Sequence, residues 1–483
     1  MGHNRKRLTQ HRINGPLDQS PHDRRILSKL LELDAAQARD FRAAVTEAGT
    51  RLGLDYVRDS GETIIIPVNP TPVVPTRRQI SYLDGIVRAL SSAVARVAEQ
   101  RLKDRVLAAK LELSDAELEW LKLAERAPGR PATRVFHRWD VAIELANDPA
   151  ASHARFFEVN SVDVGGIHYA AATREVMLES LRTIGVDHLS LDPATAGQDP
   201  RTVLLAELRA HAKAIGRNLR FVAIAENQDF TTGITEAASL VEFLRARGVD
   251  AECVDVRKFE LNRRKHVCAG GRRVDVIYRN IELRDLVGLQ AAGADLKAFQ
   301  VAAATGLLCS SPLGELDHKS LWEVLHGPEH WPSLTPLERK VVARHIPWTR
   351  LLTQRSTHSP GSRLVDLPEY VRRHRSRLVM KPNRSCGGQG VTIGDVTSQS
   401  EWERTLDQAM AAPCTWVAQE LIPIPRRRSA TLSRTGRYRP QTVYTVYGLF
   451  TSPAGLAFVG RASPFPVVNV MQGGGMLAVL GHA

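Results

Sequence analysis

The stretch from Leu378 to Gly394 constrains the fold of this chain more than any other. An apolar run ends at a lysine, a loop with three glycines follows, and a second apolar run resumes, which predicts strand, loop and strand. Glycine lets a backbone approach a ligand closely, and successive N–H groups beside a lysine can hold phosphate oxygens. A Walker-type loop or a dinucleotide fingerprint would instead open a helix. The residues concerned are Lys381, Gly387, Gly388 and Gly390, and the same pattern is also typical of a glycine-rich hairpin with a surface lysine.

The length of 483 residues exceeds what one ordinary hydrophobic core supports, so we expect two to four subdomains. No apolar run approaches the roughly 20 residues of a membrane span. The first 29 residues are polar and basic and lack the apolar core of a secretory signal, which predicts a cytoplasmic protein without membrane contact. The five cysteines are scattered and odd in number, which favours reduced thiols.

The net charge of +13 comes largely from arginines clustered in residues 5–12, 372–377 and 426–439. Such a charge is typical of proteins that bind nucleic acid or an anionic small ligand such as a nucleotide. The clusters lack the aromatic stacking motif of an RNA-binding module, so a solvated basic surface with an anion site is favoured over nucleic-acid binding. Residues 426–440 hold six arginines and no acid, and we expect them to form a mobile loop.

Residues 1–130 predict a helical region behind a basic tail. The tail covers residues 1–22, and helical patterns follow over 34–54, 80–102 and 114–125. Ser114 and Glu117 have the spacing of a capping box at the start of the last helix. We find no motif with catalytic or binding chemistry in this quarter of the chain.

Residues 131–200 contain two short strand patterns, 138–143 and 155–160, which predict a hairpin. Side chains alternate along a strand, so the polar residues of each strand share one face. Two acids and an amide brought together across a hairpin offer the oxygen ligands that Mg²⁺ prefers. A hairpin with a polar face toward water is the alternative. The residues are Arg138, Asp140, Glu158 and Asn160.

Residues 201–310 alternate strands and helices and predict a separate α/β unit. Strand patterns cover 219–225, 251–256 and 274–278, and helical patterns cover 234–248 and 286–305. The alternation is also typical of a dinucleotide-binding fold, but the first strand is not followed by a GxGxxG motif.

Residues 311–483 hold the glycine-rich stretch and several polar residues that are weak signals individually. Lys319 opens a helix and, taken alone, is more typical of a surface charge than of a ligand contact. A strand over 415–422 ends with Gln419, Glu420 and two apolar residues, which is typical of an adenine-binding edge or of an ordinary edge strand. Arg461 and a second glycine-rich run, 467–475 with Asn469, end the series.

Taken in order, these motifs resemble those of the circularly permuted ATP-grasp ligases, among which glutathionylspermidine synthase is the relative to compare first. The order is Arg-x-Asp, Glu-x-Asn, a lysine, Lys-Pro with a glycine-rich hairpin, and Gln-Glu, from about Thr133 to the C-terminus. The resemblance implies an α/β (α+β) fold: an ATP-grasp domain in permuted order, with a Rossmann-like α/β subdomain and a helical N-terminal region. Within it, residues 131–200 would be the metal-binding part, 201–310 the α/β subdomain, and 311–483 the nucleotide-binding part.

The resemblance also implies roles for single residues. Asp140, Glu158 and Asn160 would hold Mg²⁺ against ATP, and Arg138 would contact the substrate carboxylate or the transferred phosphoryl group. Lys319 and Lys381 would bind phosphates, Gly387, Gly388 and Gly390 would cover them, and Gln419 and Glu420 would meet the adenine edge. Arg461, with Asn469 and residues 473–475, would complete the catalytic part of the site.

The activity that the resemblance implies is ATP-dependent joining of a carboxylate to an amine, each a small molecule or peptide, through an acylphosphate. The chain departs from the pattern at Gln389, where we expect a basic residue, and it has no cysteine before Cys253 to serve an N-terminal amidase. The alternative is therefore a non-catalytic ATP- or peptide-binding protein on the same fold.

Overall fold

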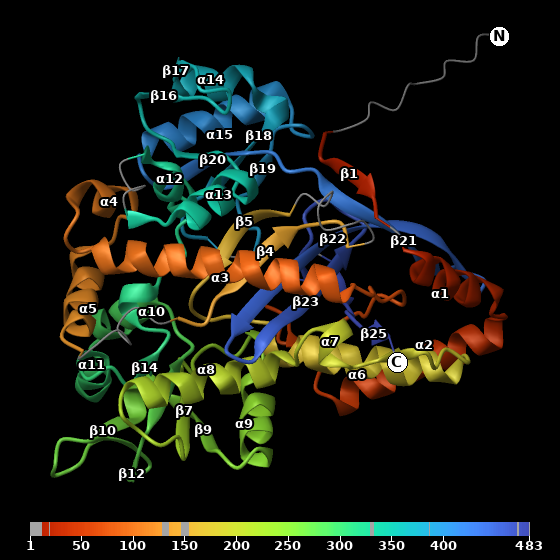
Figure 1. Cartoon of the computed structure of the whole chain (residues 1–483), viewed down its shortest axis with the longest axis horizontal. Helices are drawn as coiled ribbons and strands as arrows, with labels where there is room; N and C mark the ends of the chain where they lie inside the picture. Colours follow the sequence, from red (N-terminus) through yellow and green to blue (C-terminus); the bar gives the residue numbers. More distant parts are fainter. Residues whose placement is uncertain are drawn as a thin grey trace.

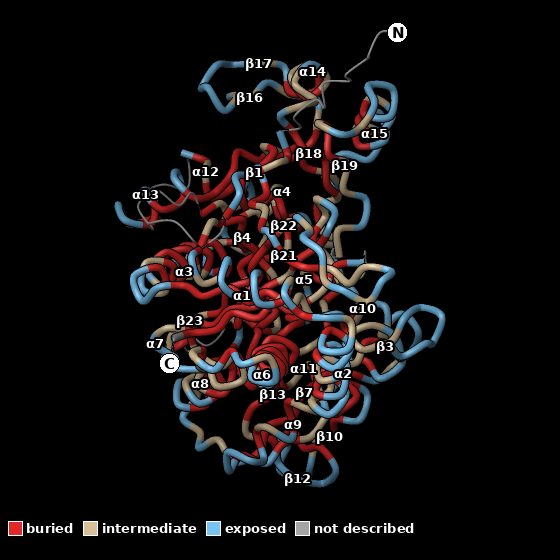
Figure 2. Tube along the Cα trace, turned by 90° about the vertical axis from the view of Figure 1, so that its right-hand side faces the viewer, coloured by how far each residue is buried: buried red, intermediate tan, exposed pale blue. Residues whose placement is uncertain are grey.

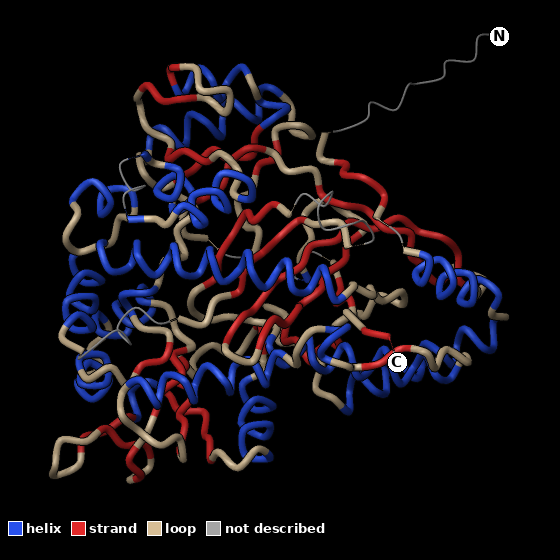
Figure 3. Tube along the Cα trace, in the orientation of Figure 1, coloured by secondary structure: helices blue, strands red, loops and turns tan. Residues whose placement is uncertain are grey.

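The computed structural model describes residues 12–18, 20–127, 135–145, 154–328, 333–385, 387–470 and 473–482 of the chain. It is a mixed α/β protein in which several sheets are surrounded by helices (Figure 3). The basic tail before residue 12, the connection between the two strands of the predicted hairpin, and Cys386 lie outside the described residues. Among the helices of the described ranges, none has the length and apolar character that a bilayer crossing requires.

A seven-stranded sheet forms the centre of the molecule, with the order β1-β21-β22-β23-β24; β4 also pairs with β22, and β5 pairs with β4. The pairings are antiparallel except that of β1 with β21, which is parallel. Much of β4, β22 and β23 is buried (Figure 2). The strands are β1 (Asn14–Leu17), β4 (Arg138–Ala142), β5 (Arg155–Asn160), β21 (Ile424–Leu432), β22 (Tyr438–Ser452), β23 (Gly455–Ser463) and β24 (Gly475–Leu477).

The expectation of a mobile loop over residues 426–440 is wrong, because this segment is most of a hairpin between β21 and β22. The strands pair from Arg426 opposite Tyr444 to Leu432 opposite Tyr438. Arg427 is buried and lies 2.8 Å from the carboxylate of Asp23, whereas its neighbours point to the other face. The arginine-rich composition suggested a loop, although the side chains alternate between the two faces of the sheet as they do in any strand.

A smaller four-stranded antiparallel sheet carries the glycine-rich stretch, at the top of Figure 1. Its order is β15-β20-β18-β19, and Val379 and Met380 of β18 pair with Ile393 and Thr392 of β19. The predicted strand, loop and strand is therefore confirmed. The elements are β15 (Thr349–Leu351), β18 (Leu378–Pro382), β19 (Thr392–Ile393) and β20 (Trp416–Glu420), with α14 (Leu367–Arg373) and α15 (Gln399–Ala411) packed on them.

A parallel sheet with the order β14-β13-β7-β9 lies at the opposite end of the molecule (Figure 1). Its strands are β7 (Phe221–Glu226), β9 (Asp250–Asp255), β13 (Val276–Arg279) and β14 (Leu308–Cys309), and its helices include α9 (Ala237–Ala246). The helix predicted over 286–305 is two helices, α10 (Leu283–Ala291) and α11 (Lys297–Ala304), because Gly293 takes a left-handed φ of 91° between them.

The N-terminal helices pack on the central sheet and on the unit that contains the parallel sheet. Helix α3 crosses the central sheet (Figure 1) and shares a core with Trp139 and Tyr447, and Trp120 of α5 packs against Phe299 of α11. The capping box at Ser114 and Glu117 is confirmed. The prediction of a tail over residues 1–22 is wrong for the part that the structure describes, because β1 and the first residues of α1 lie within this range. The helices are α1 (Pro21–Glu32), α2 (Ala35–Arg51), α3 (Arg77–Gln100), α4 (Arg105–Lys110) and α5 (Asp115–Glu125).

The remaining elements connect these sheets. They are the helices α6 (Ile167–Thr183), α7 (Pro193–Ala196), α8 (Pro200–Ala214), α12 (Leu321–His326) and α13 (Pro336–His345). The short strands are β2 (Asp55–Val57), β3 (Thr63–Ile65), β6 (Leu189–Ser190), β8 (Gly233–Ile234), β10 (Phe259–Leu261), β11 (Val267–Ala269), β12 (Arg272–Arg273), β16 (Ser356–His358), β17 (Leu364–Asp366) and β25 (Gly481–His482).

Candidate functional site

One cavity of about 330 Å³ lies where the β4–β5 hairpin, the four-stranded sheet and β23 meet. Strands β4 and β5 pair with Arg138 opposite Asn160 and Asp140 opposite Glu158, which brings the polar side chains of the hairpin together. The predicted residues that line the cavity are Arg138, Asp140, Glu158, Asn160, Lys319, Lys381, Gly387, Gly388, Gln419, Glu420, Arg461 and Asn469. Segments more than two hundred positions apart in the chain thus share one cavity.

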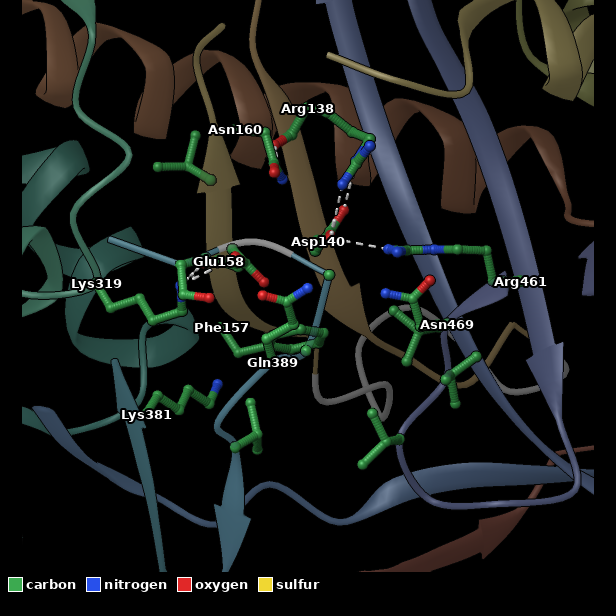
Figure 4. A pocket seen from close by; sticks show the side chains of 18 of the residues that line it. Arg138, Asp140, Phe157, Glu158, Asn160, Lys319, Lys381, Gln389, Arg461 and Asn469 are labelled. Atoms are coloured by element: carbon green, nitrogen blue, oxygen red, sulfur yellow. Dashed lines mark hydrogen bonds and ion pairs between the residues drawn. The ribbon is translucent and has the colours of Figure 1, made fainter. Parts of the chain in front are cut away.

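Asp140 lies between two guanidinium groups on one side of the cavity (Figure 4). Arg138 Nε donates to Asp140 Oδ1 at 2.9 Å, and Arg461 approaches Asp140 Oδ2 at 2.8 Å. Burial by itself would raise the pKa of Asp140, but the two guanidinium groups outweigh it and hold the pKa below its ordinary value. Asp140 is therefore an ionised carboxylate with a fixed orientation.

Lys319 lies across the cavity from Arg461 (Figure 4) and connects the hairpin to the glycine-rich loop. Its Nζ is 3.2 Å from Glu158 Oε1 and also donates to the backbone carbonyl of Ser385. Its backbone N–H donates to the carbonyl of Asn383 at 2.9 Å. The buried ammonium group of Lys319 is thus held at the boundary between the hairpin and the loop.

Lys381 is the last cation of β18 before the loop, and its side chain is buried. Its Nζ donates to Gln419 Oε1 at 2.7 Å and lies 5.2 Å from the ring centroid of Phe157. Burial lowers the pKa of Lys381 to about 8, and Lys319 adds to this effect, while Glu158 and Asp140 oppose it. An ammonium group with this pKa gains from an anionic ligand, because the ligand's charge replaces lost hydration.

Gln419 and Glu420 end β20 but have different partners. Gln419 is buried, and its Nε2 donates to Thr349 Oγ1 at 3.1 Å while its oxygen accepts from Lys381. The Glu420 carboxylate lies 2.6 Å from the guanidinium of Arg155. The side chain of Gln419 therefore positions Lys381, and the apolar residues Leu421 and Ile422 continue the wall beyond β20.

The three glycines of the loop do not have equivalent positions. Gly387 and Gly388 line the cavity, whereas Gly390 does not. All three have left-handed φ values, between 68° and 72°. A Cβ at Gly390 would lie 2.8 Å from Pro382 Cγ, so this glycine is required by the turn itself.

The oxygen atoms of the hairpin are candidate ligands for Mg²⁺. Among the described residues, no group of three or more His, Cys, Asp or Glu side chains is placed to hold a metal ion. The predicted set has two carboxylates and one amide, Asp140, Glu158 and Asn160, which are oxygen donors of the kind that Mg²⁺ takes together with phosphate oxygens. The residues present are compatible with a magnesium ion shared with a nucleotide.

Sequence reasoning missed a group of acids on one flank of the cavity, namely Glu282, Glu315 and Asp317. Burial raises the pKa of Glu282 to about 7 and raises that of Asp317 well above its ordinary value. Asp317 could have been predicted to lie at the site, because it is two residues before Lys319. Nothing in the sequence near Glu282 indicates that Glu282 lines the cavity. Sequence reasoning also missed Ile13, which lines the same cavity.

The fold is of a known type. A solved glutathione synthetase-like effector from Globodera pallida, in its apo form, has a TM-score of 0.63 and 11% sequence identity, and the match covers 95% of this chain and 98% of that one. This likeness shows the fold alone: a mixed α/β fold similar to that of the glutathione synthetase-like effector.

The curated relatives include a putative glutamate–cysteine ligase of Frankia alni, which is 27% identical over 217 residues. The match covers 42% of this chain and 23% of that protein, so the chain spans less than a quarter of the relative's length. No protein-family model matches the chain.

Proposed function

We propose that the protein is an ATP-dependent carboxylate–amine ligase that forms an amide through an acylphosphate. The observation that carries the proposal is a single cavity in which Asp140, Glu158 and Asn160 face Lys319 and Lys381. The names of the curated relative, a putative glutamate–cysteine ligase, and of the similar solved structure, a glutathione synthetase-like effector, agree with this class of reaction.

The order of the two halves along the chain supports the circularly permuted form of the ATP-grasp fold. The hairpin with the proposed metal-binding residues, 138–160, precedes the proposed nucleotide-binding sheet, 378–420, in the sequence. Both halves nevertheless contribute to one cavity. In the ordinary order, the metal-binding segment would follow the nucleotide-binding one.

Each group of side chains in the cavity has its own role in the proposed reaction. Lys319 and Lys381 neutralise phosphate oxygens of ATP, and the N–H groups near Gly387 and Gly388 cover them. Arg138 and Arg461 hold Asp140 ionised and are placed to attract the attacking carboxylate or the transferred phosphoryl group. Magnesium, when bound by Asp140, Glu158 and Asn160, supplies further positive charge to the phosphates. The amine then displaces phosphate from the acylphosphate to give the amide.

The proposal predicts that Asp140→Asn and Glu158→Gln each lower amine-dependent ADP release by roughly 100-fold or more, because phosphoryl transfer depends on charge neutralisation. ADP is measured by a coupled assay after a screen of carboxylates and amines for phosphate release, with the product identified by mass. Asp407→Asn, at an exposed position of α15, is the matched control, and thermal melting verifies folding. ADP release at the wild-type rate in both variants would refute the assignment.

Gln389 favours the second candidate, a non-catalytic ATP- or peptide-binding protein. It is exposed and lines the cavity at the position where we expect a basic side chain. The same screen separates the two functions, because the second candidate binds ATP or a peptide without amine-dependent turnover for any substrate pair.

A further inference from the structure

The segment at the start of the described chain forms part of the cavity wall. Ile13 lies in the predicted tail, yet it is only 4% exposed and lines the cavity. It belongs to an apolar cluster with Val379 and Ile393 of the four-stranded sheet and with Ile424 and Val446 of the seven-stranded sheet. Residue 13 thus completes the apolar end of the site together with residues that come far later in the sequence.

The backbone of Ile13 connects the two sheets that enclose this end. Its N–H donates at 3.1 Å to Oδ2 of Asp395, which lies two residues after the end of β19. Its carbonyl accepts from the N–H of Ile424 at 2.9 Å. Tyr444 donates from its hydroxyl to Asn14 Oδ1 at 2.5 Å. Strand β1 therefore lies along β21, as Figure 1 shows, with Ile13 between the two sheets.

Residues after Ile13 fix this position. A Cβ at Gly15 would lie 2.5 Å from the carbonyl oxygen of Ile424, so only glycine allows β1 to approach β21 this closely. The carboxylate of Asp18, which is fully buried, accepts from the N–H of Leu145 at 2.8 Å. The side chain of Ile13 is thus held in the cavity by the fold of the segment.

We propose that Ile13 contacts the base of the nucleotide, so that strand β1 sets the affinity of the site for the nucleoside part of its ligand. The inference rests on the proposed function, in which this cavity takes a nucleoside triphosphate. With the phosphates at Lys319 and Lys381, the base needs an apolar part of the cavity lining. The lining around Glu282 and Glu315 is polar, since both carboxylates are ion-paired with arginines. The lining around Ile13 is instead an apolar slot that continues into Leu421 and Ile422, directly after β20.

The experiment is calorimetric titration of the full chain with ATP and with inorganic tripolyphosphate, which carries the phosphates without a base. Ile13→Ala is expected to raise the Kd for ATP roughly tenfold, because most of the apolar contact is removed, and Ile13→Val roughly twofold. The Kd for tripolyphosphate is expected to be unchanged in both variants. This difference separates a base contact from a general change in the site.

Leu17→Ala is the matched control, since Leu17 belongs to the same strand but is 45% exposed and does not line the cavity. It is expected to leave both dissociation constants unchanged. Wild-type ATP affinity in Ile13→Ala, or equal weakening of ATP and tripolyphosphate, would overturn the inference. If the wild-type protein binds neither ATP nor tripolyphosphate, both this inference and the proposed function are overturned. If ATP binds in a manner that depends on Ile13 but no turnover occurs, only the ligase assignment is overturned.

Discussion

The affinity for ATP should fall steeply between pH 7 and pH 9, because Lys381 titrates in that range. Burial lowers its pKa to about 8. With that pKa, about nine tenths of the free protein carries the charge at pH 7 and about one tenth at pH 9, so the Kd for ATP should rise roughly tenfold. Bound phosphate raises the pKa of Lys381, so the complex keeps the proton that the free protein loses.

The stability of the fold should change in the opposite direction, which separates lost binding from unfolding. The folded pKa of Lys381, about 8, is below its ordinary value of 10.5. Between these two values the unfolded chain binds more protons than the folded one, so the contribution of Lys381 to the free energy of unfolding rises with pH. The destabilisation caused by burying the charge is fully present below pH 8 and is relieved toward pH 10.5.

The assay is calorimetric titration of ATP at pH 7, 8 and 9 and constant ionic strength, with urea unfolding at each pH. Lys381→Arg carries a charge that does not titrate, so its Kd should be nearly constant over this range. Lys297→Met, which removes an exposed lysine of α11, should keep the wild-type pH dependence. A constant Kd in the wild type, or an unchanged slope in Lys381→Arg, would show that another group controls the titration.

Two predictions concern stability. Glu315→Gln should lower the free energy of unfolding, measured in urea, by about 3–5 kcal/mol. The substitution leaves the buried Arg279, 2.7 Å from Glu315, without its counter-charge. A change below about 1 kcal/mol would contradict this reasoning. Gly390→Ala should lower the melting temperature more than Gly61→Ala does. Both glycines have a positive φ, but only at Gly390 would the added Cβ lie 2.8 Å from Pro382. Equal effects would show that the contact with Pro382 relaxes freely.

The parts of the fold that could be predicted are those with short-range signals. The polar alternation of residues 138–160 predicted the pairing of β4 with β5, and the glycines after Lys381 predicted the turn between β18 and β19. In both cases the two strands are close in sequence and the pattern has the period of a strand. The cavity then follows only if distant segments meet, which the order of motifs suggested through a family resemblance.

The parts that could not be predicted depend on long-range contacts or on misleading composition. Ile13 stands in a polar, basic stretch without periodicity, and its position depends on the pairing of Asn14 with Ile424. Strand β21 carries adjacent arginines that are typical of a loop, yet Arg427 is neutralised inside the protein by Asp23. Tertiary partners of this kind override local preference and leave no trace in a single sequence.

The arrangement of charge in the cavity gives a reason to expect that nucleotide and metal bind together. Lys319 lies 3.2 Å from Glu158, so a phosphate that attracts Lys319 alone leaves a partly buried carboxylate without its partner. A cation that attracts Glu158 alone leaves the buried ammonium of Lys319 without its counter-charge in the same way. When both enter, each charge exchanges one partner for another, and neither desolvation cost is left uncompensated. The pairing of Lys319 with Glu158 therefore favours the complete metal–nucleotide complex over either component alone.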